Sequence, residues 1–452
     1  MSELIVSVSG LRGIVGENLT PDVAMRYCCA FASTLPDGSI VLTHDGRTTG
    51  RMLVDAVRAG LTAVGRDVID ADVAATPTTG VLVRSTGAVG GIQVSASHNP
   101  PEYNGLKLIG GRGCVISASE GQKVIEVWRA QDPARVGPTE MGQVTECEDS
   151  VSGHWKLVAA LVDVTRIRSH GFRVVLDANH GSGSLLGRRL LEELGCHVQI
   201  LGEQPDGRFA HPPEPTAANL ADVQSKITEA NAVVGFCQDP DADRLAVIDE
   251  TGRYIGEEYT LAMCVDHVLH QRKGPVVTNC STSRMSEDVA IRHGVPFFHS
   301  AVGEANVTEI MIRVGAVIGG EGNGGVIEPR VGLIRDSFVG MALLLDAMAA
   351  RETKISELAN ELPSYSMLKT KIPLERERLA AAFDAIEQRF SDAKANRMDG
   401  LRLDWSDKWL LVRPSNTEPI ARIVAEATTA ADAQRLCDEA AEVFNLVSRH
   451  QT

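Results

Sequence analysis

A short apolar run that ends in a polar, often glycine-rich loop recurs along the first 325 residues of this 452-residue chain. The loops that follow these runs are residues 43–47, 95–100, 177–181, 238–243, 278–283 and 319–325. β-Branched runs that alternate with amphipathic helical stretches are typical of buried parallel strands in α/β units. Because each of three consecutive segments carries two such loops, the pattern predicts a weak threefold repeat of one α/β domain. Ligands bind at the carboxyl ends of strands in open α/β sheets, so we expect three of these loops to converge on one cleft.

The rest of the chain has a different order of elements. We predict a helix over residues 375–395, strands over 401–404, 409–413 and 420–427, and a final helix over 430–447. Strands that follow one another directly indicate antiparallel pairing in an α+β domain. The fold class is therefore α/β, with three similar domains and a smaller C-terminal α+β domain. The expected domains are residues 1–152, 153–252, 253–365 and 366–452.

Charge and cysteine content restrict the partners and the compartment of the chain. Its formal net charge is −15, and a uniformly acidic surface repels nucleic acid and anionic membranes, so neither is an expected partner. An anionic substrate would need a cleft that gathers Arg and Lys locally. The nine cysteines show no CxxC spacing, which indicates reduced thiols. The sequence shows no secretory signal pattern and no apolar run of about 18 residues, so a cytoplasmic protein is expected.

Three carboxylates follow the apolar run near residue 236. Asp239, Asp241 and Asp243 lie at alternate positions of one loop, and such a set of hard oxygen ligands suits Mg²⁺. An EF-hand also begins with this spacing, but Arg244 stands where that loop needs its glycine, and a strand-like run precedes the loop. An acidic surface turn is the remaining structural alternative. A second strand from Arg244 to Ile248 indicates that the loop is tightly held.

Ser97 lies in the loop Ser95–Pro100, at the end of another apolar run. A serine there can act as a nucleophile, but its hydroxyl must be activated or must already carry phosphate. The G-x-S-x-G elbow of α/β-hydrolases is absent, and an ordinary turn is the default interpretation of this segment alone. Lys107 supplies a cation nearby. A phosphoserine oxygen at residue 97 would complete the Mg²⁺ shell of the carboxylate loop.

Two further loops have the composition of ligand sites. The segment Arg413–Pro419 offers a guanidinium, hydroxyls, an amide and backbone N–H groups to a phosphate, with Arg422 as a second charge, although a polar hairpin would look similar. Positive charge also gathers at 10–13 and 45–47. In the loop Gly319–Gly325, small residues allow close approach of a ligand, and Glu321 and Asn323 can bind sugar hydroxyls. That loop contains neither a Rossmann fingerprint nor a Walker A lysine, which argues against nucleotide binding.

Taken together, these four loops resemble those of the α-D-phosphohexomutase superfamily, which includes phosphoglucomutase, phosphomannomutase and phosphoglucosamine mutase. The resemblance covers essentially the whole chain, with the motifs in family order. It implies three similar α/β domains and a smaller C-terminal domain around a central cleft. It also implies that a phosphoserine enzyme converts hexose 6-phosphate to hexose 1-phosphate through a 1,6-bisphosphate, which serves as activator. The expected ligands are thus sugar phosphates and one Mg²⁺ per site, and both monomer and homodimer remain open.

The resemblance assigns a role to each motif residue. Ser97 would carry the phosphoryl group and join Asp239, Asp241 and Asp243 as a metal ligand, with Arg244 orienting the metal loop. The catalytic candidates are Arg12 and Lys107, for proton transfer or charge stabilisation, and His98, for holding the phosphate on Ser97. The substrate-binding candidates are Glu321, Asn323, Arg413, Ser415, Asn416, Thr417 and Arg422.

Two positions depart from the pattern that many relatives share. Gly325 stands where the family often has a His with an acid/base role, and Asn416 replaces a common Gly. These forms resemble an archaeal-type branch often labelled phosphoglucosamine mutase, so glucosamine phosphate is slightly favoured over glucose and mannose phosphates. A sugar-phosphate phosphatase and a non-catalytic sugar-phosphate sensor are the other functional hypotheses.

Overall fold

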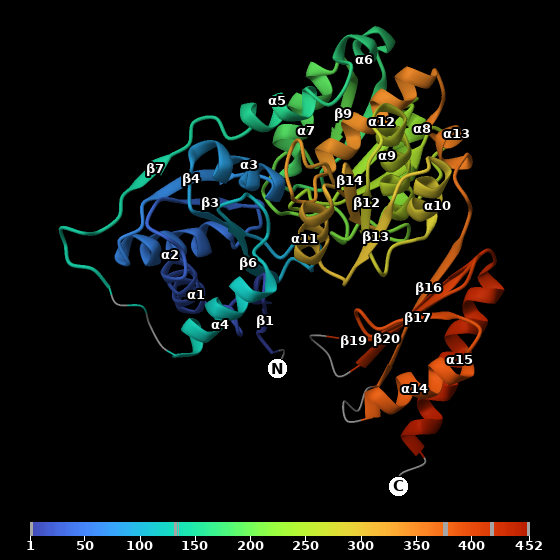
Figure 1. The fold of residues 1–452 in the computed structure, drawn as a ribbon. Coiled ribbons are helices and arrows are strands. Elements are labelled where there is room, and N and C mark those ends of the chain that lie inside the picture. Colours follow the sequence, from blue (N-terminus) through green and yellow to red (C-terminus); the bar gives the residue numbers. More distant parts are fainter. Residues whose placement is uncertain (1–2, 131–132, 134, 374–377, 416–419, 450–452) are drawn as a thin grey trace.

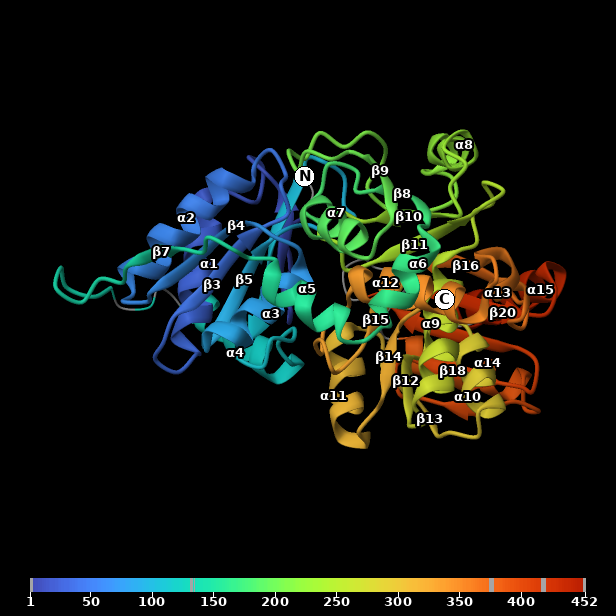
Figure 2. The same ribbon diagram turned by 90° about the horizontal axis from the view of Figure 1, so that it is seen from above.

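Four β-sheets follow one another along the chain in the computed structural model (Figure 1). The structure describes residues 3–130, 133, 135–373, 378–415 and 420–449. The first sheet, in blue, and the C-terminal sheet, in red, lie on opposite sides of the second and third sheets when the molecule is seen from above (Figure 2).

The first sheet has seven strands in the order β1-β2-β6-β5-β3-β4-β7. Apolar residues on one face of the sheet pack against α1, α2 and α4, whereas Val41 and Ile109 on the other face pack against α3. The strands are β1 (Ile5–Ser7), β2 (Gly10–Ile14), β3 (Ile40–His44), β4 (Val68–Val73), β5 (Gly90–Val94), β6 (Tyr103–Gly110) and β7 (Val144–Glu146). The helices are α1 (Pro21–Ser33), α2 (Gly50–Ala63), α3 (Thr76–Thr86) and α4 (Ala118–Ala130).

The second and third sheets have four strands each, in the orders β11-β10-β8-β9 and β13-β12-β14-β15. The elements of the second are α5 (Ser152–Ala159), α6 (Val164–His170), β8 (Arg173–Asp177), α7 (Gly183–Glu193), β9 (His197–Leu201), α8 (Ala221–Glu229), β10 (Val234–Gln238) and β11 (Leu245–Asp249). Those of the third are α9 (Glu257–Gln271), β12 (Val276–Asn279), α10 (Met285–Arg292), β13 (Phe297–Ser300), α11 (Glu304–Val314), β14 (Ile318–Glu321), β15 (Gly325–Ile327), α12 (Ser337–Arg351) and α13 (Ile355–Asn360).

The same strand arrangement recurs in these three sheets. A parallel pair, β3–β5, β8–β10 or β12–β14, confirms the predicted parallel strands. The second strand of each pair then turns back into an antiparallel neighbour, β6, β11 or β15. The phosphoserine-like, carboxylate and sugar loops are the three connections made by this turn. Of these three neighbours, only the strand after Asp243 was predicted from the sequence, without a direction. Because all three pair antiparallel, the sheets are mixed rather than purely parallel.

A single apolar core joins the second and third sheets. Helix α12 is apolar over nearly its whole circumference, with Asp346 as a buried exception, and it is buried over most of its length, as suits a helix surrounded by protein. It contacts α5, α6 and α7 of the second sheet and α9 of the third. The first and C-terminal sheets have separate main cores.

The C-terminal sheet is antiparallel, in the order β16-β20-β19-β18-β17. Its elements are β16 (Ser366–Pro373), α14 (Leu379–Arg389), β17 (Lys394–Asn396), β18 (Leu401–Asp404), β19 (Trp409–Pro414), β20 (Ile420–Ala427) and α15 (Ala430–Arg449). The three predicted strands and the final helix are confirmed. The helix predicted over 375–395 is too long, because α14 ends at Arg389 and the chain re-enters the sheet at Lys394.

Alternation along β19 gives this sheet two different faces. Leu410 and Val412 pack under α14 and α15, whereas Trp409 and Leu411 pack against Cys280 of the third domain.

All nine cysteines are free, and all but the half-buried Cys147 are buried. Among the residues that the structure describes, no helix combines the length and apolar character needed to cross a membrane.

Candidate active site

Ser97 lies at the centre of a tightly held turn between β5 and β6. Its side chain is buried, and its backbone has a φ of +50°, a conformation that costs energy for any residue with a Cβ. The Ser97 hydroxyl donates to Asp239 Oδ2 at 2.7 Å, and His98 Nδ1 lies 3.4 Å from the same hydroxyl. The predicted nucleophile therefore contacts the predicted metal loop directly, across two domains.

The guanidinium of Arg47 holds the backbone of this turn in place. Its Nη1 and Nη2 atoms donate to four backbone carbonyls at 2.6–2.8 Å, those of Ser97, Asn99, Pro100 and Tyr103. Arg47 also pairs with Asp45, which accepts a hydrogen bond from Ser95 Oγ at 2.7 Å. The positive charge expected near residues 45–47 thus holds the backbone of the loop, and sequence reasoning missed this role.

Each of the three α/β domains has two of the predicted loops. In each domain, the loop that comes first in the chain supports the loop that comes second. Asp45 supports the turn at Ser97, as described. Ser182 donates through both its N–H and its hydroxyl to the carbonyl of Pro240 in the carboxylate loop, each at 2.9 Å. Asn279 Nδ2 donates to Glu321 Oε1 in the sugar loop at 2.7 Å. The six loops predicted from the sequence therefore act in supporting pairs.

The three aspartates form a compact, fully buried group. One carboxylate oxygen from each lies within 4.8 Å of the others. Asp239 Oδ1 accepts from the backbone N–H groups of Asp243 and Arg244 at 3.1 Å, which folds the loop around it. The side chain of Arg244 is more distant, with Nε 3.9 Å from Asp243 Oδ1 and 4.0 Å from Asp239 Oδ2.

Lys107 balances part of the negative charge of this loop. Its Nζ lies 2.7 Å from both Asp241 Oδ2 and Asp243 Oδ2. Burial alone would raise the pKa of Asp241, but Lys107 outweighs it and the pKa is lowered. Burial, with the charges of Asp241 and Asp243, raises the pKa of Asp239. Burial tends to lower the pKa of Lys107, but the two carboxylates raise it, so this side chain stays protonated.

The donor set fits a hard divalent cation. Asp241 Oδ1 and Asp243 Oδ1 are buried and have no hydrogen-bond partner in the described part of the chain. Buried carboxylate oxygens are rarely left without a partner, and three convergent carboxylates are a suitable oxygen set for such an ion. Asp239, Asp241 and Asp243 could therefore hold a metal ion beside the Ser97 hydroxyl.

Arg12 and His98 lie on the open side of Ser97. Arg12, on β2, donates through Nη1 to Asn99 Oδ1 at 3.1 Å, and its burial lowers the pKa of its guanidinium. Burial and the cations Arg244 and Arg12 lower the pKa of His98 to about 2, so its imidazole is neutral near pH 7. His98 can thus accept or donate a hydrogen bond there without adding charge.

The sugar loop presents Glu321 and Asn323 between β14 and β15. Glu321 Oε1 accepts from Asn279 Nδ2 and from the N–H of Gly303, and Glu321 Oε2 lies 3.0 Å from Arg335 Nη1. Among the described residues, the buried Asn323 Oδ1 has no hydrogen-bond partner. Glu321 is therefore fixed in place, whereas Asn323 keeps an acceptor for a ligand.

The C-terminal domain contributes a group of cations. Arg422 lies opposite Lys371 in one strand pair and opposite Arg413 in the next. Like charges that face each other across strands are destabilising, so this cluster is suited to an anion. Together with Lys369, these side chains line a cavity of about 470 Å³ between the third and C-terminal domains. Lys369 and Lys371 were not predicted. Ser415 is buried and directly follows β19, the strand that carries Arg413. Asn416 and Thr417 lie outside the described residues.

A second cavity, of about 430 Å³, brings together residues that sequence reasoning assigned to separate motifs. It is lined by Arg12, His98 and Lys107 of the first domain, by Arg335 of the third and by Arg422 of the C-terminal domain. This acidic chain therefore concentrates cations where three domains meet, as the cleft argument required. Arg335 was not predicted, since it follows no loop motif.

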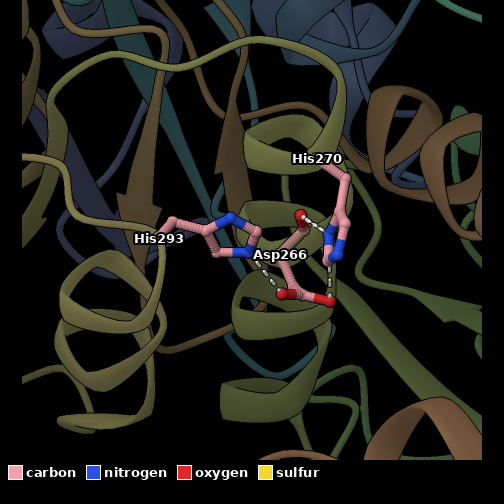
Figure 3. A group of neighbouring side chains, drawn as sticks. All are labelled: Asp266, His270 and His293. Carbon is pink, nitrogen blue, oxygen red and sulfur yellow. Dashed lines mark hydrogen bonds and ion pairs between the residues drawn. The ribbon is translucent and has the colours of Figure 1, made fainter.

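Another set of potential metal ligands, Asp266, His270 and His293, lies between α9 and α10 (Figure 3). Its carboxylate is already occupied: Asp266 Oδ1 accepts from Arg292 Nη2 at 2.7 Å and pairs with His293 Nε2 at 2.8 Å, while Arg351 lies 3.4 Å from Oδ2. Burial would raise the pKa of Asp266, but His293 and Arg292 lower it. Two guanidinium groups would repel a cation here, so the geometry fits an ion-pair cluster that holds the two helices together.

Four models of known protein families match successive segments of the chain: phosphoglucomutase/phosphomannomutase alpha/beta/alpha domain I over residues 4–135, domain II over 152–252, domain III over 257–365 and the C-terminal domain over 370–443. The chain belongs to the phosphoglucomutase/phosphomannomutase family. The resemblance to phosphohexomutases and the predicted architecture of three α/β domains plus a C-terminal domain are thereby confirmed.

Curated relatives and a solved structure are similar over nearly the full chain. A phosphoglucomutase/phosphomannomutase from Thermococcus kodakarensis is 38% identical, covering 92% of this chain and 93% of the relative. A probable phosphoglucosamine mutase from Pyrococcus horikoshii is 34% identical over 97% of each chain. The crystal structure of a family protein from Burkholderia thailandensis superimposes with a TM-score of 0.86 at 28% identity, covering 99% of this chain and 98% of that one. The chain is therefore an isomerase of the phosphohexomutase class.

Proposed function

We propose that this phosphoglucomutase/phosphomannomutase family enzyme interconverts hexose 6-phosphate and hexose 1-phosphate, with Ser97 as the phosphoryl carrier. The observation that carries the proposal is the 2.7 Å contact between the Ser97 hydroxyl and Asp239, beside a cavity lined by cations from three domains. A phosphoryl group on Ser97 would face those cations. Mere binding of a sugar phosphate would require neither the serine nor the three carboxylates.

Mg²⁺ is the proposed metal, held by Asp239, Asp241, Asp243 and an oxygen of phosphorylated Ser97. The two buried carboxylate oxygens without partners support this set. When bound, the ion would neutralise the charge of the moving phosphoryl group.

The chain's own residues would bind and orient the substrate. The cations of the C-terminal domain, chiefly Arg413 and Arg422, hold the phosphate that is not being transferred. The free sugar hydroxyl then attacks the phosphorus on Ser97: a new O–P bond forms, the bond to Ser97 Oγ breaks, and Oγ receives a proton as the hydroxyl loses one. After the 1,6-bisphosphate turns around in the cleft, the other phosphate returns to Ser97 by the reverse step. Arg12 and Lys107 stabilise the transferring charge, and His98 supports the phosphate as a neutral partner.

Glucosamine phosphate is the favoured substrate within this class. The carboxyl group of Glu258 lies against the sugar loop: a Cβ built at Gly322 would be 1.9 Å from Glu258 Oε2. Burial raises the pKa of Glu258 to about 8, and a neighbouring ammonium group would favour its ionised form. An amino sugar would supply such a group, whereas glucose and mannose would not. The name of the Pyrococcus horikoshii relative agrees with this slight preference, whereas that of the Thermococcus kodakarensis relative points to glucose and mannose phosphates.

The experiment is a Mg²⁺-dependent isomerisation panel with glucosamine, N-acetylglucosamine, glucose and mannose phosphates and trace 1,6-bisphosphate. We expect turnover by the wild type, none by Ser97→Ala, and normal turnover by the control Ser225→Ala, whose residue is exposed on α8. Release of inorganic phosphate without isomerisation would identify a phosphatase. Binding of a sugar phosphate that Ser97→Ala preserves, with no turnover by either protein, would identify a sensor.

The bisphosphate is proposed as the activator that phosphorylates Ser97. Enzyme treated with a phosphatase should show a lag that added glucose 1,6-bisphosphate removes. Equal initial rates with and without the bisphosphate, on enzyme verified by mass spectrometry to be unphosphorylated, would contradict this step.

A further inference from the structure

Position 325 of the sugar loop has no side chain, and another residue fills the volume that one would need. A Cβ built on Gly325 would lie 2.3 Å from Arg335 Cδ and 2.9 Å from Arg335 Cγ. Both separations are shorter than carbon atoms tolerate, so any side chain at 325 would have to displace Arg335. At this point of the sugar loop, Arg335 lines the cavity, although it lies ten residues further along the chain.

The backbone of Arg335 is held on both sides. Its own N–H donates to Glu304 Oε1 at 2.7 Å. The next residue, Asp336, is the N-cap of α12, and its Oδ1 accepts from the N–H groups of Phe338 and Val339. Such caps stabilise the start of a helix. The guanidinium therefore extends from a fixed point rather than from a free loop.

Three nitrogen atoms of Arg335 contact carboxylates from three separate segments. Nη2 lies 2.6 Å from Asp243 Oδ2 in the metal loop, Nη1 lies 3.0 Å from Glu321 Oε2 in the sugar loop, and Nε lies 3.1 Å from Glu304 Oε2 on α11. Only 7% of the residue is exposed, and it lines the 430 Å³ cavity with Arg12, Lys107 and Arg422. A planar guanidinium can span three such acceptors, whereas a lysine ammonium on a flexible stem cannot reproduce this fork.

We propose that Arg335 is a positioning residue of the phosphoryl-transfer reaction. It fixes Glu321 of the sugar loop relative to Asp243 of the metal loop, and it supplies a permanent cation where Gly325 supplies no side chain. The inference rests on the proposed function, because it assigns Glu321 to the sugar and Asp243 to the metal. Since arginine keeps its proton at all working pH values, the contribution of Arg335 is geometry and charge rather than proton transfer.

The first test compares Arg335→Met with Arg330→Met in the isomerisation assay. Arg330 is a matched control: it lies in the same segment, but it pairs with Glu328 and is 41% exposed. We expect Arg335→Met to lower kcat by about a hundredfold with less than about a threefold change in KM, because misalignment acts on the transition state more than on ground-state binding. Arg330→Met should match the wild type, and Arg335→Lys should recover about a tenth of the activity. Equal kcat values for Arg335→Met and the wild type would overturn the proposal.

A double-mutant cycle tests the coupling of Gly325 and Arg335, and its single variant Gly325→Ala, which retains the arginine, keeps the proposal testable if Arg335→Met folds poorly. In the wild-type background Gly325→Ala should lower kcat by about thirtyfold, because the new Cβ displaces Arg335. In an Arg335→Ala background the same substitution should cost less than about threefold, because the obstructing side chain is gone. Equal losses in both backgrounds would show that Gly325 and Arg335 are not coupled. An inactive wild type would instead refute the proposed function, so the two failures are distinguishable.

Discussion

At the residue scale, the buried carboxylates of the site are paired with cations from other parts of the chain. Asp241 and Asp243 share Lys107 from β6, and Asp243 also contacts Arg335 from the segment before α12. In each of these two aspartates the paired oxygen is Oδ2, which leaves Oδ1 directed elsewhere and without a described partner. One oxygen thus stabilises the loop, and the other stays available for a ligand.

Replacing Asp241 with Asn tests this division directly. We expect the Mg²⁺ concentration for half-maximal activity to rise by about tenfold or more and kcat to fall by about a hundredfold, because a neutral amide is a weaker ligand and a weaker partner for Lys107. Mg²⁺ should also raise the melting temperature of the wild type more than that of Asp241→Asn. Asp222→Asn on the exposed side of α8 is the control. A normal Mg²⁺ response in Asp241→Asn would remove the metal loop from the mechanism.

Arg47 should matter for stability as much as for activity. Arg47→Met would remove the hydrogen bonds to four loop carbonyls and the buried ion pair with Asp45, which predicts a loss of about 3–5 kcal/mol of unfolding free energy. Denaturant titration measures this loss. Arg51→Met, at a side chain that is 76% exposed, should change stability by less than about 0.5 kcal/mol. A stable but inactive Arg47→Met would mean that this residue acts on the substrate rather than on the fold.

Some site residues could be predicted from the sequence, and others could not, for a physical reason. Ser97 and the three aspartates belong to short motifs at strand ends, where local order already indicates chemistry. Arg47 and Arg335 act on atoms that are 50 and 92 residues away in the chain, and no local pattern reveals such a partner. The absence of a side chain at Gly325 likewise depends on Arg335, ten residues away, whose side chain occupies the space that a Cβ at position 325 would need.

At the element scale, the turn-back strand after each functional loop decides where the loop can lie. The antiparallel partner anchors both ends of the loop, so Ser97, Asp241 and Glu321 project from a two-strand base. Of these strands only the one after Asp243 was predicted from the sequence, and its direction was not, because a fully buried run looks the same in parallel and antiparallel neighbours. Helix ends are also set by tertiary contacts, as the early end of α14 at Arg389 shows.

We expect Asp346 on α12 to make the free energy of unfolding depend on pH in the acidic range. Burial would raise its pKa, but His267 and Arg166 outweigh burial and lower the pKa to about 2. The ionised form is thus favoured in the folded state, so its contribution is complete above pH 4 and is lost as pH falls from about 4 to 2. The contribution is about 1–2 kcal/mol after allowance for solvent around Arg166.

Unfolding titrations at pH 6, 4, 3 and 2 test this dependence. The wild type should lose stability more steeply between pH 4 and 2 than Asp346→Asn, which has no charge to lose. Asp55→Asn, at a side chain that is 72% exposed, should follow the wild-type curve. Parallel curves for the wild type and Asp346→Asn would contradict the assignment.

At the scale of the whole molecule, polar contacts as well as apolar ones join the domains. His154 on α5 contacts Thr78 Oγ1 of the first domain at 2.9 Å and Asp336 Oδ2 of the third at 2.7 Å. The C-terminal domain has its own core and meets the third through Trp409 and through the contact of Glu426 Oε1 with the N–H of Arg284, at 2.9 Å. The domain that carries the cation cluster thus has a core of its own and meets the third domain through a small apolar cluster and polar contacts.

His154→Ala should therefore loosen the first domain without directly altering the cavity. Loss of two buried hydrogen bonds, one of them to a carboxylate, predicts a decrease of about 2–4 kcal/mol in unfolding free energy. Calorimetry should then show an earlier transition that the wild type lacks. His197→Ala, at an exposed residue of β9, is the control. An unchanged calorimetric trace for His154→Ala would show that His154 does not contribute to the coupling of the first domain to the others.

Because nearly all of the cysteines are buried, the reactivity of each thiol reports whether the domain around it has opened. A thiol reagent can react with a buried sulfur only after the surrounding domain opens, and burial further slows the reaction by raising the pKa of thiols such as Cys28 and Cys237. The sulfurs are spread over all four domains, from Cys28 in α1 to Cys437 in α15. Brief labelling with a thiol reagent, read out by mass spectrometry, would therefore show without any engineered probe the order in which the domains open on heating or on removal of substrate.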